Sequence, residues 1–213
     1  MDESKSRLMG FRVVGILFIL IATYIVFQTL TSEKKKSFWS QFRNQPKFNL
    51  LEQPGNWRDQ YGKKVSLKDI KKKVTILSFV YAECRTACPR IMGDMIRLKN
   101  SITASKTDAN YLLFLFDINA SQKTIDSFYK NYSIDKKQWT VLTGDRKSLN
   151  QLAEKFRIKY SVSKMDSKNE RDYMHTNFLA ITKSSGDTLI VDYGLNFSHE
   201  KLVKAIKLNI DEK

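Results

Sequence analysis

Cysteine, histidine and proline are all rare in this sequence, which has two, two and three of them among 213 residues. Because structural zinc sites take four protein ligands and the chain has no third thiol, a structural zinc site is disfavoured. Internal repeats and low-complexity tracts are absent as well. Hydrophobic residues make up 42% and aromatic residues 12% of the chain, which is enough for a packed core and excludes general disorder.

Acidic residues are also few relative to basic ones, with 22 Asp and Glu against 37 Lys and Arg, for a net charge of +15. Such a charge usually points to nucleic acid as a partner. That interpretation fails for a domain outside the cytosol, and the N-terminus favours such a location. We therefore expect no nucleic-acid partner, and a basic surface that either faces anionic lipid or an acidic protein or simply keeps the domain soluble.

One long segment lacks charge altogether, the 18 residues from Val13 to Leu30. This is close to the roughly 20 residues that cross a bilayer as a helix. It exceeds the apolar region of a cleavable signal peptide, and no small-residue cleavage site follows it. We expect a transmembrane signal anchor over residues 11–30, after a short cytoplasmic stub of residues 1–10; a buried soluble helix is the alternative.

The orientation of this anchor does not follow from charge, because both flanks are basic. Long domains cross the membrane largely regardless of their charge, and the short stub is the natural cytoplasmic side. Residues 31–48 are polar and basic and are interpreted as a tether. We expect a single-pass protein of the bacterial inner membrane, with a domain of residues 49–213 in the periplasm.

The domain alternates buried strands with amphipathic helices, the pattern of an α/β protein with a largely parallel sheet. It ends in a β-hairpin and a helix, as thioredoxin-like folds do, so we expect a central mixed sheet flanked by helices. The predicted strands are 74–81, 111–118, 139–144, 175–182 and 188–194, and the predicted helices are one after Pro89, 121–132, 148–158 with a cap near Ser148, and 198–208.

Both cysteines lie in one segment, "YAECRTACPR", which directly follows the strand predicted at 74–81. Functional sites of open α/β sheets form outside the carboxyl ends of the strands. Thiols four residues apart share one face of a helical turn, so Cys84 and Cys88 can reach a common point. They could form a structural disulfide, a redox pair or a metal site. Thiolates suit Cu(I), and an added imidazole accommodates Cu(II).

The two histidines are the other candidate metal ligands. His175 begins the predicted strand 175–182, which we place beside the cysteine loop in the sheet. His199 lies at the start of the last predicted helix, where a solvated position in the first turn is expected. Taken alone, either histidine is more often structural than a ligand.

At these residues the chain resembles the Sco/SenC family of copper-binding, thioredoxin-like proteins. The resemblance lies in "YGKKVSLKDI", "ILSFVYAECRTACP" with its C-x-x-x-C-P signature, "WTVLTG", "LAEKFRIKY" and "YMHTNFLAIT". It implies that Cys84, Cys88 and His175 bind copper as Cu(I) and Cu(II). It also implies a metallochaperone rather than a turnover enzyme. Such a protein takes copper from a donor protein and delivers it to the binuclear copper site on the copper-bearing subunit of cytochrome c oxidase, or to another acceptor.

The sequence departs from the family after Asp117, where Ile-Asn-Ala-Ser replaces the usual Pro-Glu-Arg-Asp-like run. Asp117 itself either contacts the metal ligands and adjusts how they bind the metal, or it only ends a strand. Because the run is missing, the sequence does not identify the surface that contacts the copper acceptor.

A thiol-disulfide oxidoreductase that keeps partner cysteines reduced is the alternative function, with Cys84 and Cys88 as the redox pair. Against it, the spacer between the thiols has three residues instead of the two of thioredoxins, and no proline follows Pro89 to face them. An inert disulfide is a third possibility, but so small a loop stabilises little.

Overall fold

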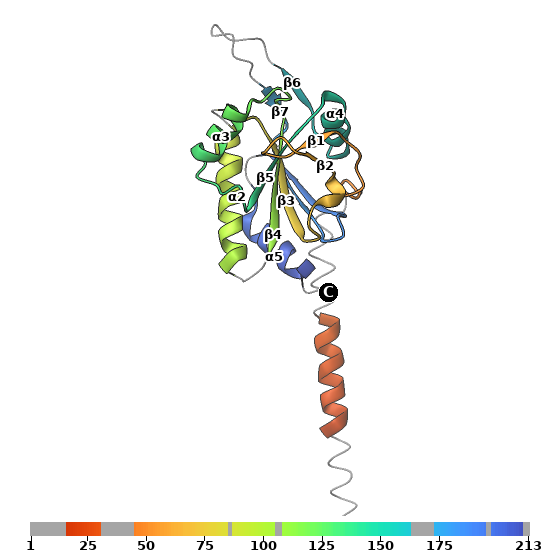
Figure 1. Cartoon of the computed structure of the whole chain (residues 1–213). Coiled ribbons are helices and arrows are strands. Elements are labelled where there is room, and N and C mark those ends of the chain that lie inside the picture. The colour runs from red at the N-terminus through yellow and green to blue at the C-terminus, as the bar shows by residue number, and fades with distance from the viewer. Residues whose placement is uncertain are drawn as a thin grey trace, which may run out of the picture. The chain divides into compact units, whose positions relative to one another are not determined.

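The computed structural model describes residues 16–30, 45–84, 87–104, 108–162, 173–194 and 197–210 (Figure 1). The chain divides into two compact units, residues 1–44 and 45–213. The elements of the second unit are β1 (Trp57–Arg58), β2 (Lys64–Val65), η1 (Leu67–Asp69), β3 (Val74–Val80), α2 (Ala87–Ala104), β4 (Ala109–Leu115), α3 (Gln122–Asn131), β5 (Trp139–Gly144), α4 (Arg146–Lys155), β6 (Tyr160–Val162), β7 (Tyr173–His175), β8 (Phe178–Thr182), β9 (Thr188–Tyr193) and α5 (His199–Ile210).

The described part of the first unit is a single helix over residues 16–30, with every side chain exposed. None of the helices in the described ranges has both the length and the apolar character that a membrane crossing requires. The predicted stub of residues 1–10, residues 11–15 of the predicted anchor and residues 31–44 of the predicted tether lie outside the described residues. The anchor therefore stays a prediction.

The second unit is built on a seven-stranded mixed sheet in the order β2-β1-β5-β4-β3-β8-β9. β3, β4 and β5 are parallel, and β8, β9 and β1 run antiparallel to their neighbours. All seven residues of β3 are buried, because this strand is central and covered on both faces. Its register with β4 runs from Val74 opposite Ala109 to Val80 opposite Leu115, so their carboxyl ends lie at the same edge.

Helices cover both faces of this sheet. Figure 1 shows α2 and α3 on one side and α4 on the other. The core on the α4 side is aromatic: the centroid of the Phe79 ring lies 5.1 to 6.1 Å from those of Phe114, Phe116, Phe178 and Phe156. The predicted α/β class and the mixed sheet flanked by helices are confirmed.

Two predicted boundaries were wrong for local reasons. The helix predicted at 148–158, α4, begins at Arg146 rather than near Ser148, because Asp145 is the N-cap and its carboxylate accepts the Ser148 N–H at 2.7 Å. The strand predicted to reach residue 118 ends at Leu115, since Asp117 bends the chain by accepting the Asn119 N–H at 3.1 Å.

The predicted strand 175–182 is also wrong, because it is two strands. His175 ends β7, which pairs with β6 in a separate two-stranded sheet, and the main sheet resumes with β8 at Phe178. The hairpin of β8 and β9 is present as predicted, and its turn has Gly186 at φ 95°, a conformation that glycine adopts without a steric cost.

The second unit carries its own core and begins four residues before the predicted position 49. Gln45 accepts the Val191 N–H at 2.7 Å, and the Phe48 carbonyl accepts the Thr188 N–H at 2.9 Å, so this segment is fixed along β9. Apart from Pro46, every buried apolar side chain of the described residues lies at Leu50 or beyond. Residues 45–213 are therefore a folding unit that can be studied alone.

Candidate metal centre

The two thiols lie where β3 gives way to α2, at the carboxyl edge of the sheet. Cys88 is the second residue of α2 and is fully buried, whereas Cys84 precedes the helix and is half-buried. The two are therefore not on one face of a single helical turn, as their spacing predicted. A different contact brings them together: the Cys88 backbone N–H points at Cys84 Sγ, 3.4 Å away. Both residues remain thiols.

Cys88 Sγ lies between the end of β3 and the histidine. The Tyr81 backbone N–H donates to it at 3.4 Å, and His175 Nε2 lies 4.0 Å away. The structure thus brings together Cys88 and His175, which are 87 residues apart in the sequence. The predicted proximity of the histidine to the cysteine loop is confirmed, although His175 arrives on β7 and not on the main sheet.

His175 is held by its own strand and by an aromatic ring. It pairs with Tyr160 across β6 and β7, and its imidazole lies against Phe116 with ring centroids 4.7 Å apart. Nδ1 lies 3.2 Å from the Thr176 carbonyl oxygen. A carbonyl only accepts, so Nδ1 carries the proton, and Nε2 keeps its lone pair on the side of Cys88.

The separation of Cys88 and His175 suits one shared metal ion. Zinc, a representative first-row ion, binds thiolate at about 2.3 Å and imidazole at about 2.0 Å. A sulfur and a nitrogen on one such ion are thus at most about 4.3 Å apart, and the observed 4.0 Å is within that reach. The hydrogen bond from Nδ1 is the support that metal-binding histidines usually have.

Cys84 is not gathered with the other two into a preformed cluster. Within the described ranges, no group of three or more His, Cys, Asp or Glu side chains is positioned to hold a metal ion. Cys84 instead lines a cleft of about 450 Å³ between the cysteine loop and α3, with Lys123, Ser127 and Tyr132 on its other wall. This thiol therefore faces a space that another molecule can enter.

Tyr132 is the group in this cleft whose acidity responds to the thiols. Burial, and then the charges of Cys88 and Cys84, raise the pKa of Tyr132 to about 12. The phenol stays protonated at neutral pH, so it can donate a hydrogen bond within the cleft but cannot supply a negative ligand. No sequence pattern singled out this residue, because its neighbourhood depends on where α3 packs.

Asp117 and His199 make contacts of their own, and the supporting role of Asp117 at the metal site stays a prediction. The Asp117 carboxylate is used by the Asn119 backbone N–H, at 3.1 Å, in the bend after β4. His199 begins α5, half-buried rather than solvated, and its Nε2 lies 3.0 Å from Ser101 Oγ.

Phe116 and Tyr160, which sequence reasoning missed, support the histidine. Their rings lie 4.7 Å apart, so Phe116 contacts both His175 and the residue that pairs with it. A signal was present in the sequence, because Phe116 belongs to an apolar run that ends at the same edge as the thiols.

Comparison with known proteins gives the family of the chain. A family model described as SCO1/SenC matches residues 44–210. The SCO1 protein homolog of Bacillus subtilis (strain 168) is 31% identical over 97 residues, which is 45% of this chain and 50% of the relative, so the match spans half of that protein.

Solved structures establish the fold. BsSco, described as a member of the Sco family of cytochrome c oxidase assembly proteins with a disulfide switch, superposes with a TM-score of 0.65 at 23% identity, over 81% of this chain and 99% of that one. Arabidopsis thaliana ScoI, solved with copper bound, gives a TM-score of 0.65 at 18% identity, over 75% of this chain and 98% of that one.

Proposed function

Because the chain belongs to the SCO1/SenC family, we propose that it binds copper through Cys84, Cys88 and His175 and hands it on during the assembly of cytochrome c oxidase. The observation that carries this proposal is the 4.0 Å separation of Cys88 Sγ and His175 Nε2. Solved structures of the same fold contain copper, which supports the choice of metal.

Copper is the cargo in this proposal, and the three ligands have different parts in holding it. The buried Cys88 thiolate and the Nε2 lone pair of His175 form the fixed side of the site. Cys84, half-buried and facing the cleft, is the ligand that closes on arriving copper and opens on release. Three ligands leave a position open, so an acceptor can add its own ligand before Cys84 leaves.

The same considerations identify the surface for the partner. The cleft beside Cys84 is lined by hydroxyl, amide and ammonium groups of α3, among them Lys123, Thr124, Ser127 and Asn131. Such a surface suits a polar polypeptide segment better than an apolar one. We assign it to the acceptor, the copper-bearing subunit of the oxidase or another copper protein, and to the copper donor in turn.

The N-terminal segment is proposed to anchor the protein in the bacterial inner membrane, with residues 45–213 in the periplasm. Its support is the absence of charge from Val13 to Leu30 and the exposed apolar helix over residues 16–30. A C-terminal alkaline phosphatase fusion tests the topology: activity in intact cells is expected, and an inactive fusion would place the domain in the cytoplasm.

Copper titration of the 45–213 fragment, reduced and under anaerobic conditions, tests the metal site. We expect one Cu(I) and one Cu(II) site, loss of Cu(II) binding in His175→Ala, and loss of both in Cys84→Ser/Cys88→Ser. His199→Ala is the matched control, because it removes the other histidine and is expected to bind both ions as the wild type does. Equal binding by His175→Ala and His199→Ala would refute the assignment.

A second function, thiol-disulfide exchange, is supported by one contact. The Cys88 N–H at the start of α2 points at Cys84 Sγ, and a helix N-terminus stabilises a thiolate. In such a reaction the Cys84 thiolate attacks a partner disulfide, and Cys88 displaces the partner from the mixed disulfide. The partner leaves as a dithiol, reduced by two electrons, and Cys84 and Cys88 end as a disulfide.

The two functions differ in their need for the histidine. His175 has no part in the exchange, so His175→Ala should reduce a copper-free model disulfide at the wild-type rate. If the wild type reduces such a disulfide quickly and binds copper only weakly, the exchange becomes the better assignment.

A further inference from the structure

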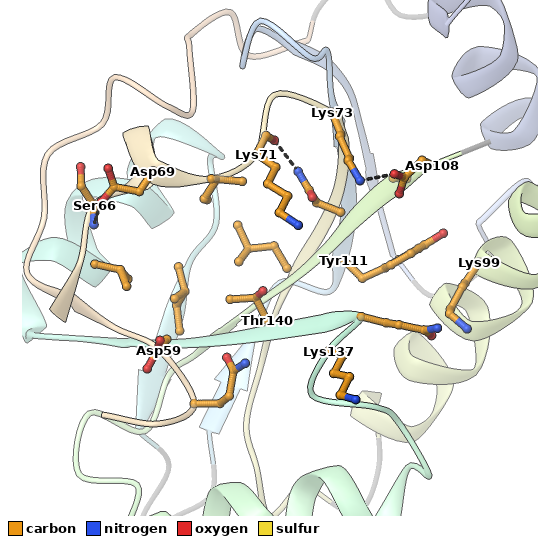
Figure 2. A pocket seen from close by; sticks show the side chains of 18 of the residues that line it. Asp59, Ser66, Asp69, Lys71, Lys73, Lys99, Asp108, Tyr111, Lys137 and Thr140 are labelled. Atoms are coloured by element: carbon orange, nitrogen blue, oxygen red, sulfur yellow. Dashed lines mark hydrogen bonds and ion pairs between the residues drawn. The ribbon is translucent and has the colours of Figure 1, made fainter. Parts of the chain in front are cut away.

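A second cavity lies at the opposite edge of the sheet from the thiols. It has a volume of about 560 Å³ and is formed at the amino ends of β4 and β5, between the η1 loop and the end of α2 (Figure 2). β3 and β4 pair over seven residues from Val74 and Ala109 to Val80 and Leu115. At about 3.3 Å per residue the cavity is roughly 20 Å from the thiol edge, so it is a separate site.

The carboxylates around this cavity are already used by the protein. Asp59 accepts the backbone N–H groups of Tyr61 and Lys63, at 2.9 and 3.0 Å. Asp69 accepts the Ser66 N–H at 3.1 Å in the capping box of η1. Asp108 forms an ion pair with Lys73, which Figure 2 marks with a dashed line.

Of the four lysines that line the cavity, Lys73 is taken by that ion pair, and the other three are not used in the same way. Lys71, Lys99 and Lys137 come from three different elements, the loop before β3, α2 and the loop before β5, and all three line the cavity (Figure 2). Within the described residues, their ammonium groups make no hydrogen bond or ion pair. The same holds for the hydroxyl of Tyr111. Burial, and then the charge of Asp108, raise the pKa of Tyr111 to about 12, so this hydroxyl remains a donor.

Between these donors the lining combines polar side chains with apolar ones. Val65 and Ile70 contribute from one side, and Leu112 and Leu142 from the two strands. The volume is within the range of about 300–1,000 Å³ that is typical of small-molecule sites. Four lysines and three aspartates give the lining a net charge of +1. The three ammonium groups without an ion-pair partner, beside the apolar residues, suit a ligand that carries both a negative group and an apolar body.

We propose that this cavity binds an amphipathic organic anion, in which a carboxylate, sulfonate or phosphate contacts Lys71, Lys99 and Lys137 and an apolar body lies against the leucines. The anion has two possible sources, a small soluble metabolite or the headgroup region of an anionic lipid. Both offer the same chemistry to the cavity, and the experiment below separates them. Copper plays no part in this site.

Anilinonaphthalene sulfonate is a suitable probe, because phenylnaphthylamine has a closely similar apolar body without the sulfonate. Fluorescence titration of the 45–213 fragment is expected to give one site for the anionic probe and much weaker binding of the neutral one. Lys99→Gln/Lys137→Gln should weaken the anionic probe about tenfold or more, since charge-assisted hydrogen bonds are lost. Lys147→Gln/Lys155→Gln, two exposed lysines of α4, removes the same charge away from the cavity and should change little.

The proposal is overturned if both double variants weaken the probe equally, or if the neutral probe binds as well as the anionic one. Copper titration of each variant checks that the fold is intact. Vesicles of phosphatidylglycerol and phosphatidylcholine then identify the source. If they displace the probe, and fail to bind the Lys99→Gln/Lys137→Gln variant, the ligand is a lipid headgroup. If the probe binds and vesicles do not displace it, the ligand is a soluble anion.

Discussion

Replacing Phe116 by leucine tests how the proposed copper ligand His175 is positioned. Phe116 is fully buried, and its ring centroid lies 4.7 Å from that of His175, 4.7 Å from that of Tyr160 and 5.3 Å from that of Phe79. Leucine keeps the site apolar but removes the flat surface on which the imidazole rests. The imidazole can then turn away from Cys88, because the hydrogen bond of Nδ1 with the Thr176 carbonyl does not by itself fix the plane of the ring.

The magnitude follows from the ring contacts that are lost. Aromatic pairs contribute about 0.5–1.5 kcal/mol each beyond simple burial, so losing three pairs together with some volume should lower the free energy of unfolding by about 2–4 kcal/mol. Only the pair with His175 bears on the metal site. A loss of about 1 kcal/mol there corresponds to roughly fivefold weaker Cu(II) binding.

The control is Phe114→Leu, the same substitution two residues earlier on β4. Phe114 is also fully buried and contacts the rings of Trp57 and Phe79, but no histidine. Chemical denaturation and competitive Cu(II) titration of the 45–213 fragment should show both variants destabilised and only Phe116→Leu impaired in Cu(II) binding. If the two variants bind Cu(II) alike, the ring does not position His175 and the reasoning fails.

Two further predictions concern the fold. Gly186→Ala should lower the free energy of unfolding by about 2 kcal/mol or more, because φ is 95° and the added methyl would lie 2.4 Å from Asn49 Oδ1. Gly62→Ala is the control: φ is 77° but the space around it is open, so the loss should be only about 1 kcal/mol. Equal effects of the two variants in thermal denaturation would contradict this. Asp145→Ala should lower the melting temperature at neutral pH, because hydrogen bonds from Asn56 and Ser148 hold the pKa of Asp145 at about 2. The contribution of this carboxylate to stability is therefore present above its unfolded pKa near 4 and is lost as the pH falls through about 2. A difference in melting temperature from the wild type that does not shrink in acid would exclude the cap.

The central elements could be predicted because their sequences allow only one environment. Val74–Val80 is an unbroken apolar and β-branched run, which only a strand buried on both faces accommodates, and β5 was predicted to the residue. The start of α4 was missed because Asp145 and Ser148 are both good caps. Asp145 was chosen by the fold, in which Asn56, 89 residues away, also donates to its carboxylate at 2.6 Å.

The residues of the candidate site could be proposed from the sequence, but their geometry could not be predicted. The spacing of Cys84 and Cys88 suggested one helical face, but the Cys84 N–H bonds to the Tyr81 carbonyl in a turn, and α2 begins only at Ala87. The position of His175 depends on the pairing of β6 with β7, which no local pattern encodes. Long-range pairing of two short strands carries too few residues to leave a period in the sequence.

The unequal burial of the two thiols leads to a last prediction about their roles. Cys88 is fully buried and lies 4.0 Å from His175 Nε2, whereas Cys84 is half-buried and lines the cleft. Cys84→Ser should therefore keep a weakened Cu(II) site on Cys88 and His175. Cys88→Ser removes the sulfur that lies beside His175, so it should lose Cu(II) binding. The rate of Cu(I) transfer to a chelator, measured by stopped flow, should also change more in Cys84→Ser than in Cys88→Ser, since the exchangeable ligand is gone. If the two single variants behave alike, the thiols act as equivalent ligands, and the proposal that copper leaves through the cleft beside Cys84 would have to be abandoned.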